Sequence, residues 1–167
     1  TQPGILLSEL IYALEYRSFG NFLDPDIDES RITNDYIARR IAELRFPVDP
    51  TERAAHLGGI VATNASGSRT YRYGSTRDWV RGITLVLADG RIIKIHRGDI
   101  IAQEYSFIFT EKDGSLRNIA IPHAYSPQTK RAIGYCLEPN MDCIDLFIGS
   151  EGTLGVVGEL ELWLQKK

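Results

Sequence analysis

Apolar residues recur at helical spacing in the first part of the chain, in two separate groups. Each group repeats every three or four residues, as one buried face of an α-helix requires. The first group predicts a helix over 5–18, and the second predicts a helix that starts near Asn34 and ends before Pro47. The apolar positions are Leu7, Leu10, Ile11 and Leu14 in the first helix, and Ile37, Ile41 and Leu44 in the second.

Further along, the pattern changes to short runs rich in β-branched and aromatic residues. The two-residue turn Asp89-Gly90 between two such runs is a strong hairpin signal. The expected elements are a hairpin of 83–88 with 91–96, a hairpin of 105–110 with 116–121, a short helix over 142–148 and a strand over 156–164. Helices followed by antiparallel strands indicate an α+β fold, an antiparallel sheet flanked by helices.

Residues 56–82 show little periodicity and are rich in Gly, Ser, Thr and Asn. A stretch of this length without secondary structure usually has a function in a compact domain. Its segment 57–67 reads LGGIVATNASG, in which paired glycines and small polar side chains would let a ligand such as a pyrophosphate approach the backbone closely. The same glycines would equally serve a tight packing turn against the sheet. Both interpretations stay open at this point.

A second glycine-rich segment, 149–156, reads GSEGTLGV and leads into the last predicted strand. Its backbone could lie flat against a planar ring and offer N–H and C=O groups to the heteroatoms of that ring. The segment is not a Rossmann fingerprint, because that loop leaves a strand and opens a helix.

Basic and aromatic residues alternate over 69–81, a pattern that can pair phosphates and stack bases. The competing interpretation is a solvated connection whose aromatic residues fill the core. The net charge of −3, from 22 acidic and 19 basic residues, favours that second interpretation, so nucleic acid is not a predicted partner.

The remaining composition narrows the classes of protein. With 43% hydrophobic residues in 167, the chain can bury a core. Cys136, Cys143 and three scattered histidines form no metal-ligand spacing, and no nucleophile or paired-carboxylate motif is present, so no metal site and no catalytic residue is predicted.

No apolar run is long enough to cross a membrane. The predicted location is the cytoplasm, with peripheral membrane association left open.

Four segments, in order from residue 58 to residue 156, resemble a known family. They are 58–67, 73–80 leading into 87–90, 129–135 and 145–156. They resemble the FAD-binding domain of the vanillyl-alcohol-oxidase (PCMH) type, especially the branch with D-lactate dehydrogenase and the FAD subunit of glycolate oxidase.

The resemblance implies FAD as the cofactor, held between two lobes, with the two glycine-rich segments converging as one wall of a flavin trough. It assigns Pro50, Gly58, Gly59, Ala62, Thr63, Asn64, Ser66 and Gly67 to the pyrophosphate and ribityl part, and Glu151, Gly152, Thr153, Leu154, Gly155 and Val156 to the isoalloxazine. It places Lys130 and Tyr135 near the reactive side of the flavin, where relatives more often have an asparagine in place of Arg131.

The resemblance also implies that residues 1–167 are a partial FAD-binding domain, its second lobe. The first lobe, with the pyrophosphate loop, is expected before Thr1, and a substrate domain is expected after Lys167. The start at Thr1 instead of Met agrees with this expectation. Between Asn21 and Pro50 the chain has more residues than most relatives, which predicts an extra helix there.

The implied activity is oxidation of a 2-hydroxy acid, of the D-lactate or glycolate type, by hydride transfer to the flavin. The missing domain would bind that acid, and an iron–sulfur or quinone-linked partner would accept the electrons. No residue here supplies the base, so the chain alone is expected to bind FAD weakly or not at all and to be inactive. The alternatives are the FAD lobe of an alkyl-dihydroxyacetonephosphate-synthase-like enzyme, a nucleic-acid-binding module and an assembly scaffold.

Overall fold

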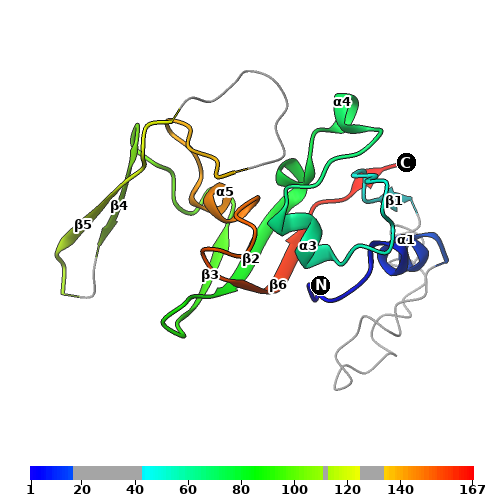
Figure 1. Cartoon of the computed structure of the whole chain (residues 1–167), viewed down its shortest axis with the longest axis horizontal. Coiled ribbons are helices and arrows are strands. Elements are labelled where there is room, and N and C mark those ends of the chain that lie inside the picture. The colour runs from blue at the N-terminus through cyan, green and yellow to red at the C-terminus, as the bar shows by residue number, and fades with distance from the viewer. Residues whose placement is uncertain (17–42, 111–112, 125–133) are drawn as a thin grey trace.

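The computed structural model describes residues 1–16, 43–110, 113–124 and 134–167, and these form short helices around antiparallel strands (Figure 1). The helices are α1 (Leu7–Tyr16), α3 (Leu57–Ala62), α4 (Thr70–Tyr73), the 3-10 helix η2 (Thr76–Trp79) and α5 (Cys143–Phe147). The strands are β1 (Leu44–Arg45), β2 (Val80–Val86), β3 (Ile92–His96), β4 (Ser106–Thr110), β5 (Leu116–Ala120), β6 (Val156–Leu162) and β7 (Gln165–Lys166). The predicted α+β class is confirmed.

The central sheet has three antiparallel strands in the order β3-β2-β6. Ile83 in the middle strand pairs with Ile95 on one side and with Leu160 on the other, and all three side chains are buried. The hairpin predicted around Asp89-Gly90 and the final predicted strand are therefore both confirmed.

The pairing of β2 with β6 contains a bulge. Thr84 pairs with Glu159, but the next residue of β2, Leu85, pairs with Val157, so that Gly158 is the extra residue on β6. A bulge of this kind bends a strand and changes the direction of the neighbouring side chains.

Helices α1, α3 and α5 contribute to the hydrophobic core beside this sheet. Leu7 of α1, Leu57 of α3 and Ile144 of α5 are all at most 1% exposed. The predicted first and last helices are thus confirmed over the described residues, α1 as far as Tyr16.

The second predicted hairpin is also confirmed, as β4 paired with β5. It extends away from the central sheet (Figure 1). Phe107 of β4 is buried, whereas every residue of β5 is exposed.

Two expectations about secondary structure change. Residues 56–82 are not an irregular loop, because α3, α4 and η2 lie within them. In α3 the buried residues Leu57, Ile60 and Val61 follow helical spacing, and their packing outweighs the cost of about 1 kcal/mol that each glycine carries in a helix interior.

The second change concerns the helix predicted after Asn34. Most of it lies outside the described residues. Leu44, which belongs to its apolar stripe, is in β1 and pairs with Lys166 of β7. Backbone pairing with a distant segment cannot be read from local spacing, which explains the difference.

Candidate flavin site

The two glycine-rich segments meet at one cavity of about 260 Å³. Gly58, Gly59 and Ala62 from α3 line one side, and Gly152, Gly155 and Val156 line another. The remaining lining residues are Pro3, Leu85, Phe147, Ser150 and Val157. Small-molecule sites usually enclose about 300 to 1,000 Å³, so this cavity has the size of one part of a larger ligand site.

Backbone hydrogen bonds hold the two segments together. The N–H of Gly149 donates to the carbonyl of Val61 at 3.0 Å, and the N–H of Glu151 donates to the carbonyl of Ala62 at 2.8 Å. The convergence expected from the sequence is therefore present in the structure, and the space between the segments is a cavity.

The glycines of this site divide into two groups. A Cβ placed on Gly58 would lie 2.8 Å from the Pro3 Cβ, one on Gly155 would lie 3.0 Å from the Val86 carbonyl oxygen, and one on Gly67 would collide with the Asp49 carbonyl. These three glycines permit close packing within the chain. A Cβ on Gly59 or Gly152 would meet no atom within 4 Å, so the chain itself gives no packing reason for these two. The packing interpretation is therefore correct for Gly58, Gly67 and Gly155, while the ligand interpretation of Gly59 and Gly152 stays a prediction. At Gly152 the φ of 77° also favours glycine.

The small polar side chains near the cavity are bonded within the chain. Asn64 is buried with φ of 46°, a conformation that asparagine tolerates, and its Oδ1 accepts from the Arg77 N–H at 2.9 Å. The Thr63 hydroxyl donates to the Gly59 carbonyl at 2.9 Å. Both side chains shape the backbone of the first segment.

Thr153 links the second segment to Tyr135. Its hydroxyl donates to the Ser150 carbonyl at 2.6 Å, and its Oγ1 lies 2.6 Å from the Tyr135 hydroxyl. Since a threonine hydroxyl has one hydrogen, Tyr135 is the donor in the second bond. The predicted neighbours Lys130 and Arg131 lie outside the described residues.

Six of the predicted site residues line the cavity and eight do not. The eight are Pro50, Thr63, Asn64, Ser66, Gly67, Glu151, Thr153 and Leu154. Pro50 lies beside Gly67, because a Cβ on Gly67 would reach the Pro50 nitrogen at 2.6 Å. Among the lining residues that the sequence did not reveal, Leu85 and Val157 are partners across β2 and β6. The signal that would have found them is the strand register, which requires the bulge to be known.

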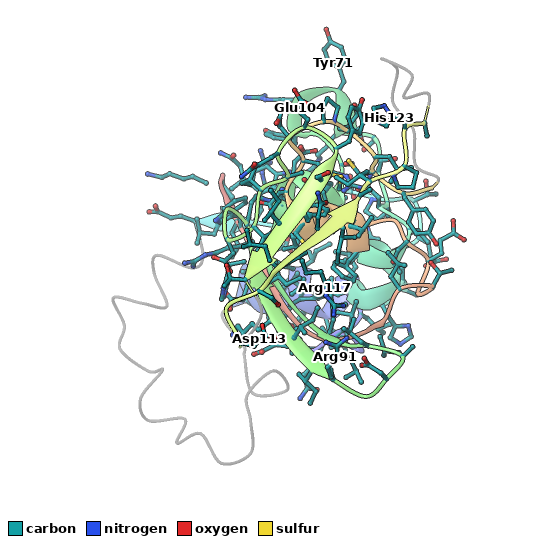
Figure 2. The ribbon with its side chains drawn as sticks, turned by 90° about the vertical axis from the view of Figure 1, so that its left-hand side faces the viewer. Tyr71, Arg91, Glu104, Asp113, Arg117 and His123 are labelled. Carbon is teal, nitrogen blue, oxygen red and sulfur yellow. The ribbon has the colours of Figure 1, made fainter. Side chains whose placement is uncertain are left out.

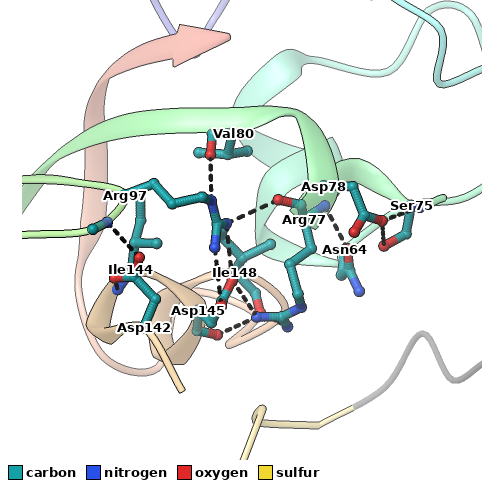
Figure 3. A network of polar contacts seen from close by, with 11 residues as sticks. Asn64, Ser75, Arg77, Asp78, Val80, Arg97, Asp142, Ile144, Asp145 and Ile148 are labelled. Carbon is teal, nitrogen blue, oxygen red and sulfur yellow. Dashed lines mark hydrogen bonds and ion pairs between the residues drawn. The ribbon is translucent and has the colours of Figure 1, made fainter. Parts of the chain in front are cut away.

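A mostly buried ionic network joins η2, α5 and the residue that follows β3 (Figure 3). Arg97 donates to both carboxylate oxygens of Asp145, at 2.9 and 3.0 Å, and also to the carbonyls of Val80 and Arg77. Burial alone would lower the pKa of Arg97, but the hydrogen bonds and charge of Asp145 outweigh it and the pKa is raised. The Arg97 guanidinium is therefore charged at any physiological pH.

Arg77 joins this network to both glycine-rich segments. Its backbone N–H bonds Asn64, and its guanidinium donates to the carbonyls of Asp145 and Ile148, directly before Gly149 (Figure 3). Arg77 therefore positions both walls of the cavity at once. The sequence had grouped it with an exposed basic run, and no local signal distinguishes it from its neighbours.

The structure divides that basic and aromatic run. Arg77 points into the network, the Trp79 indole N–H donates to the Tyr73 carbonyl at 2.7 Å, and Arg81 lies 4.0 Å from Glu161. The side chains of Arg69, Tyr71 and Arg72 are exposed on the surface. The run does not form one continuous surface for a nucleic-acid strand.

Neither cysteine is an activated nucleophile. Both are free, and burial raises the pKa of each thiol, that of Cys143 to about 11. Across 1–16, 43–110, 113–124 and 134–167, no three His, Cys, Asp or Glu side chains are grouped to hold a metal ion. In the same residues no helix has the length and hydropathy to cross a bilayer.

Comparison with known proteins supports the class of this site. Residues 32–96 match the family described as the FAD binding domain. The chain is 37% identical over 119 residues to a D-lactate dehydrogenase of Anaerostipes hadrus and 33% identical over 128 residues to a D-2-hydroxyglutarate dehydrogenase of Xanthomonas citri. It is 32% identical over 160 residues to the mitochondrial D-lactate dehydrogenase [cytochrome] of Arabidopsis thaliana.

These alignments cover most of this chain and little of each relative. They include 71%, 76% and 96% of the chain, but 18%, 20% and 21% of the respective relatives, so the chain spans about a fifth of their length. A solved alkyldihydroxyacetonephosphate synthase aligns with 99% of the chain and 18% of its own, at 19% identity and a TM-score of 0.49.

The site and the family match define one class, a flavoprotein domain with a glycine-lined wall. The chain belongs to the FAD-binding domain family of the PCMH type, of which it carries a part. The cofactor that this family indicates is FAD.

Proposed function

We propose that the chain is the second lobe of the FAD-binding domain in an FAD-dependent oxidoreductase that oxidises a 2-hydroxy acid of the D-lactate or glycolate type. The observation that supports it most directly is the shared cavity, in which Gly59 and Gly152 from distant segments both have open space above them. The named activities of the relatives, D-lactate and D-2-hydroxyglutarate dehydrogenases, support the substrate class.

The cavity residues fit a flavin in their chemistry. The open faces of Gly59 and Gly152 would let a flat ring approach the main chain, while Leu85, Phe147 and Val156 supply apolar contacts. When bound, FAD would supply the redox chemistry by accepting the hydride, and the protein would bind and orient it.

Other parts of the proposal concern the longer protein. The first lobe and the substrate domain would lie outside residues 1–167. The substrate is a small 2-hydroxy acid bound by that other domain, and an iron–sulfur or quinone-linked partner accepts the electrons. The cytoplasmic location and the inactivity of the chain alone also remain predictions.

Chemical-shift mapping tests the flavin part without requiring tight binding. We expect millimolar FAD to shift the backbone amide signals of Gly58, Gly59, Ala62, Gly152 and Gly155 in the ¹⁵N-labelled chain. Even a weak complex gives such shifts. Shifts confined to other residues, or none, would contradict the proposed wall.

A matched pair of variants adds a specific control. In Gly59→Leu a large side chain fills the open space over α3, and leucine is a good helix former, so the fold should persist while the FAD-induced shifts disappear. Gly4 is equally open but lies outside the cavity lining. The Gly4→Leu variant should therefore keep the shifts.

The substrate part is tested with the full-length gene product. Under anaerobic conditions, D-lactate, glycolate or D-2-hydroxyglutarate should bleach the flavin absorbance, and L-lactate should not. A flavoprotein that none of these acids bleaches would disprove the substrate class and leave the flavin site intact.

A further inference from the structure

We propose that Arg45, Arg69 and Arg72 form a second binding site, for the phosphate group of a small ligand or a lipid headgroup. They line a hollow of about 470 Å³ together with Ser68, Tyr71 and Tyr73. None of these six residues lines the flavin cavity. An anion bound in this hollow would therefore occupy a site separate from the proposed flavin cavity.

The charges at this hollow are not balanced within the described part of the chain. Neither Arg45 nor Arg72 has a carboxylate partner there. Arg69 lies 3.6 Å from Asp49, but Asp49 is also 3.4 Å from Arg53. The result is a local excess of positive charge in a chain whose net charge is −3.

Tyr73 holds two of these cations in place. The guanidinium carbons of Arg45 and Arg72 each lie 5.2 Å from the centre of its ring, and Arg45 donates to its hydroxyl at 2.6 Å. Cation–π contacts of this kind fix side chains that would otherwise repel one another and spread into solvent. The two guanidinium groups are therefore preorganised around a single ring.

Arg45 also has an unsatisfied donor. Its Nε is buried and has no hydrogen-bond partner. A buried donor without a partner costs about 1 to 3 kcal/mol, and such groups commonly mark the position of a water or an ion. A small shift of the Arg45 side chain would let that N–H reach an anion in the hollow that the residue lines.

The residue types favour phosphate. The planar guanidinium fork matches phosphate oxygens in two parallel hydrogen bonds, which explains the use of arginine at phosphate sites. Tyr71 is fully exposed and projects from the surface beside the hollow, where its ring could stack on a planar group attached to the phosphate (Figure 2).

The short length of helix α4 favours a single phosphate-bearing group over a nucleic-acid strand. Helix α4 has four residues and rises about 6 Å, whereas single-strand sites follow the backbone over about four or more nucleotides. The other arginines of the run do not extend the site, because Arg77 is turned inward and Arg81 pairs with Glu161.

Titration with inorganic pyrophosphate at constant ionic strength tests the proposal. We expect saturable shifts of the amide signals of 68–73 and of the Arg72 Nε–H signal. The Arg72→Gln variant should weaken binding about tenfold, the loss of one charged contact. Arg81→Gln is the matched control, since Arg81 is in the same run and its side chain is 62% exposed, and it should leave the affinity unchanged.

Vesicle binding separates the two sources of the phosphate. Co-sedimentation with phosphatidylcholine vesicles containing phosphatidic acid, lost in Arg72→Gln, would identify a lipid headgroup. Pyrophosphate binding without co-sedimentation would identify a soluble ligand.

Three results would overturn the proposal. These are equal pyrophosphate affinity in Arg72→Gln and the unmodified chain, pyrophosphate shifts at Gly59 and Gly152 instead of 68–73, and loss of the FAD-induced shifts in Arg72→Gln. The last result would make the hollow part of the flavin site. Failure of the flavin proposal would leave the pyrophosphate result unaffected.

Discussion

Two groups of arginines in this chain have opposite surroundings. Arg77 and Arg97 point inward, where they share Asp145 and donate to backbone carbonyls. Arg69 and Arg72, a few residues earlier, point outward to the hollow that Arg45 also lines, and Arg72 has no carboxylate beside it in the described part of the chain. The role of an arginine here depends on which partners the fold brings to it, and the alternation of residue types over 69–81 does not reveal that.

The energetic consequences of the two groups differ accordingly. Inward guanidinium groups are mostly removed from water and depend on their partners, so loss of one partner leaves an uncompensated charge. Outward guanidinium groups are hydrated and contribute little to the free energy of unfolding. We therefore expect the inward group to govern stability and the outward group to govern binding.

The largest effect is expected for Asp145→Asn. It removes the negative charge shared by Arg77 and Arg97, and breaking these mostly buried pairs should lower the free energy of unfolding by about 3 kcal/mol. Urea unfolding followed by circular dichroism measures it. Asp99→Asn is the control, because Asp99 is an exposed partner of His96 and should cost little. Equal losses in the two variants would refute the distinction.

A smaller effect is expected for Arg77→Lys. Lysine keeps the charge but lacks the planar fork whose two nitrogens reach the carbonyls of Asp145 and Ile148, so the free energy of unfolding should fall by about 2 kcal/mol. The amide signals of Gly149 and Asn64 should also shift, since both segments lose their common anchor. Arg81→Lys is the matched control, and a variant in which those two signals do not move would show that Arg77 has no positioning role.

The smallest effect on stability is expected for Arg72→Gln. Its guanidinium contacts the Tyr73 ring and no described carboxylate. The free energy of unfolding, measured by urea denaturation, should therefore change by less than about 0.5 kcal/mol. A loss comparable to that of Arg77→Lys would remove the distinction between the two groups.

The sequence predicted the parts of the fold that depend on local patterns. The Asp89-Gly90 turn set the β2–β3 hairpin, and helical spacing set α1. It did not predict β1, because Leu44 forms a strand only through pairing with β7 at the far end of the chain. Helix α3 was missed because the glycines at its centre hide the apolar spacing of Leu57, Ile60 and Val61.

The site was predicted in a similar way. The two glycine-rich segments were identified, and they do share a cavity with Gly59 and Gly152 open to it. Local sequence could not separate these from Gly67, which is required because the chain at Asp49 passes too close for a side chain. That difference depends on a contact between residues 18 positions apart. The wall residue Leu85 was missed for the same reason, since it reaches the cavity through its cross-strand position.

The extra residue on β6 has a consequence for the shape of the cavity. Successive side chains of a strand face opposite sides, so shortening β6 by one residue at Gly158 would exchange the orientations of the residues that precede it. Val156 and Val157, both in the cavity lining, would swap places relative to β2. The single residue Gly158 thereby sets which hydrocarbon surface a bound ring would touch.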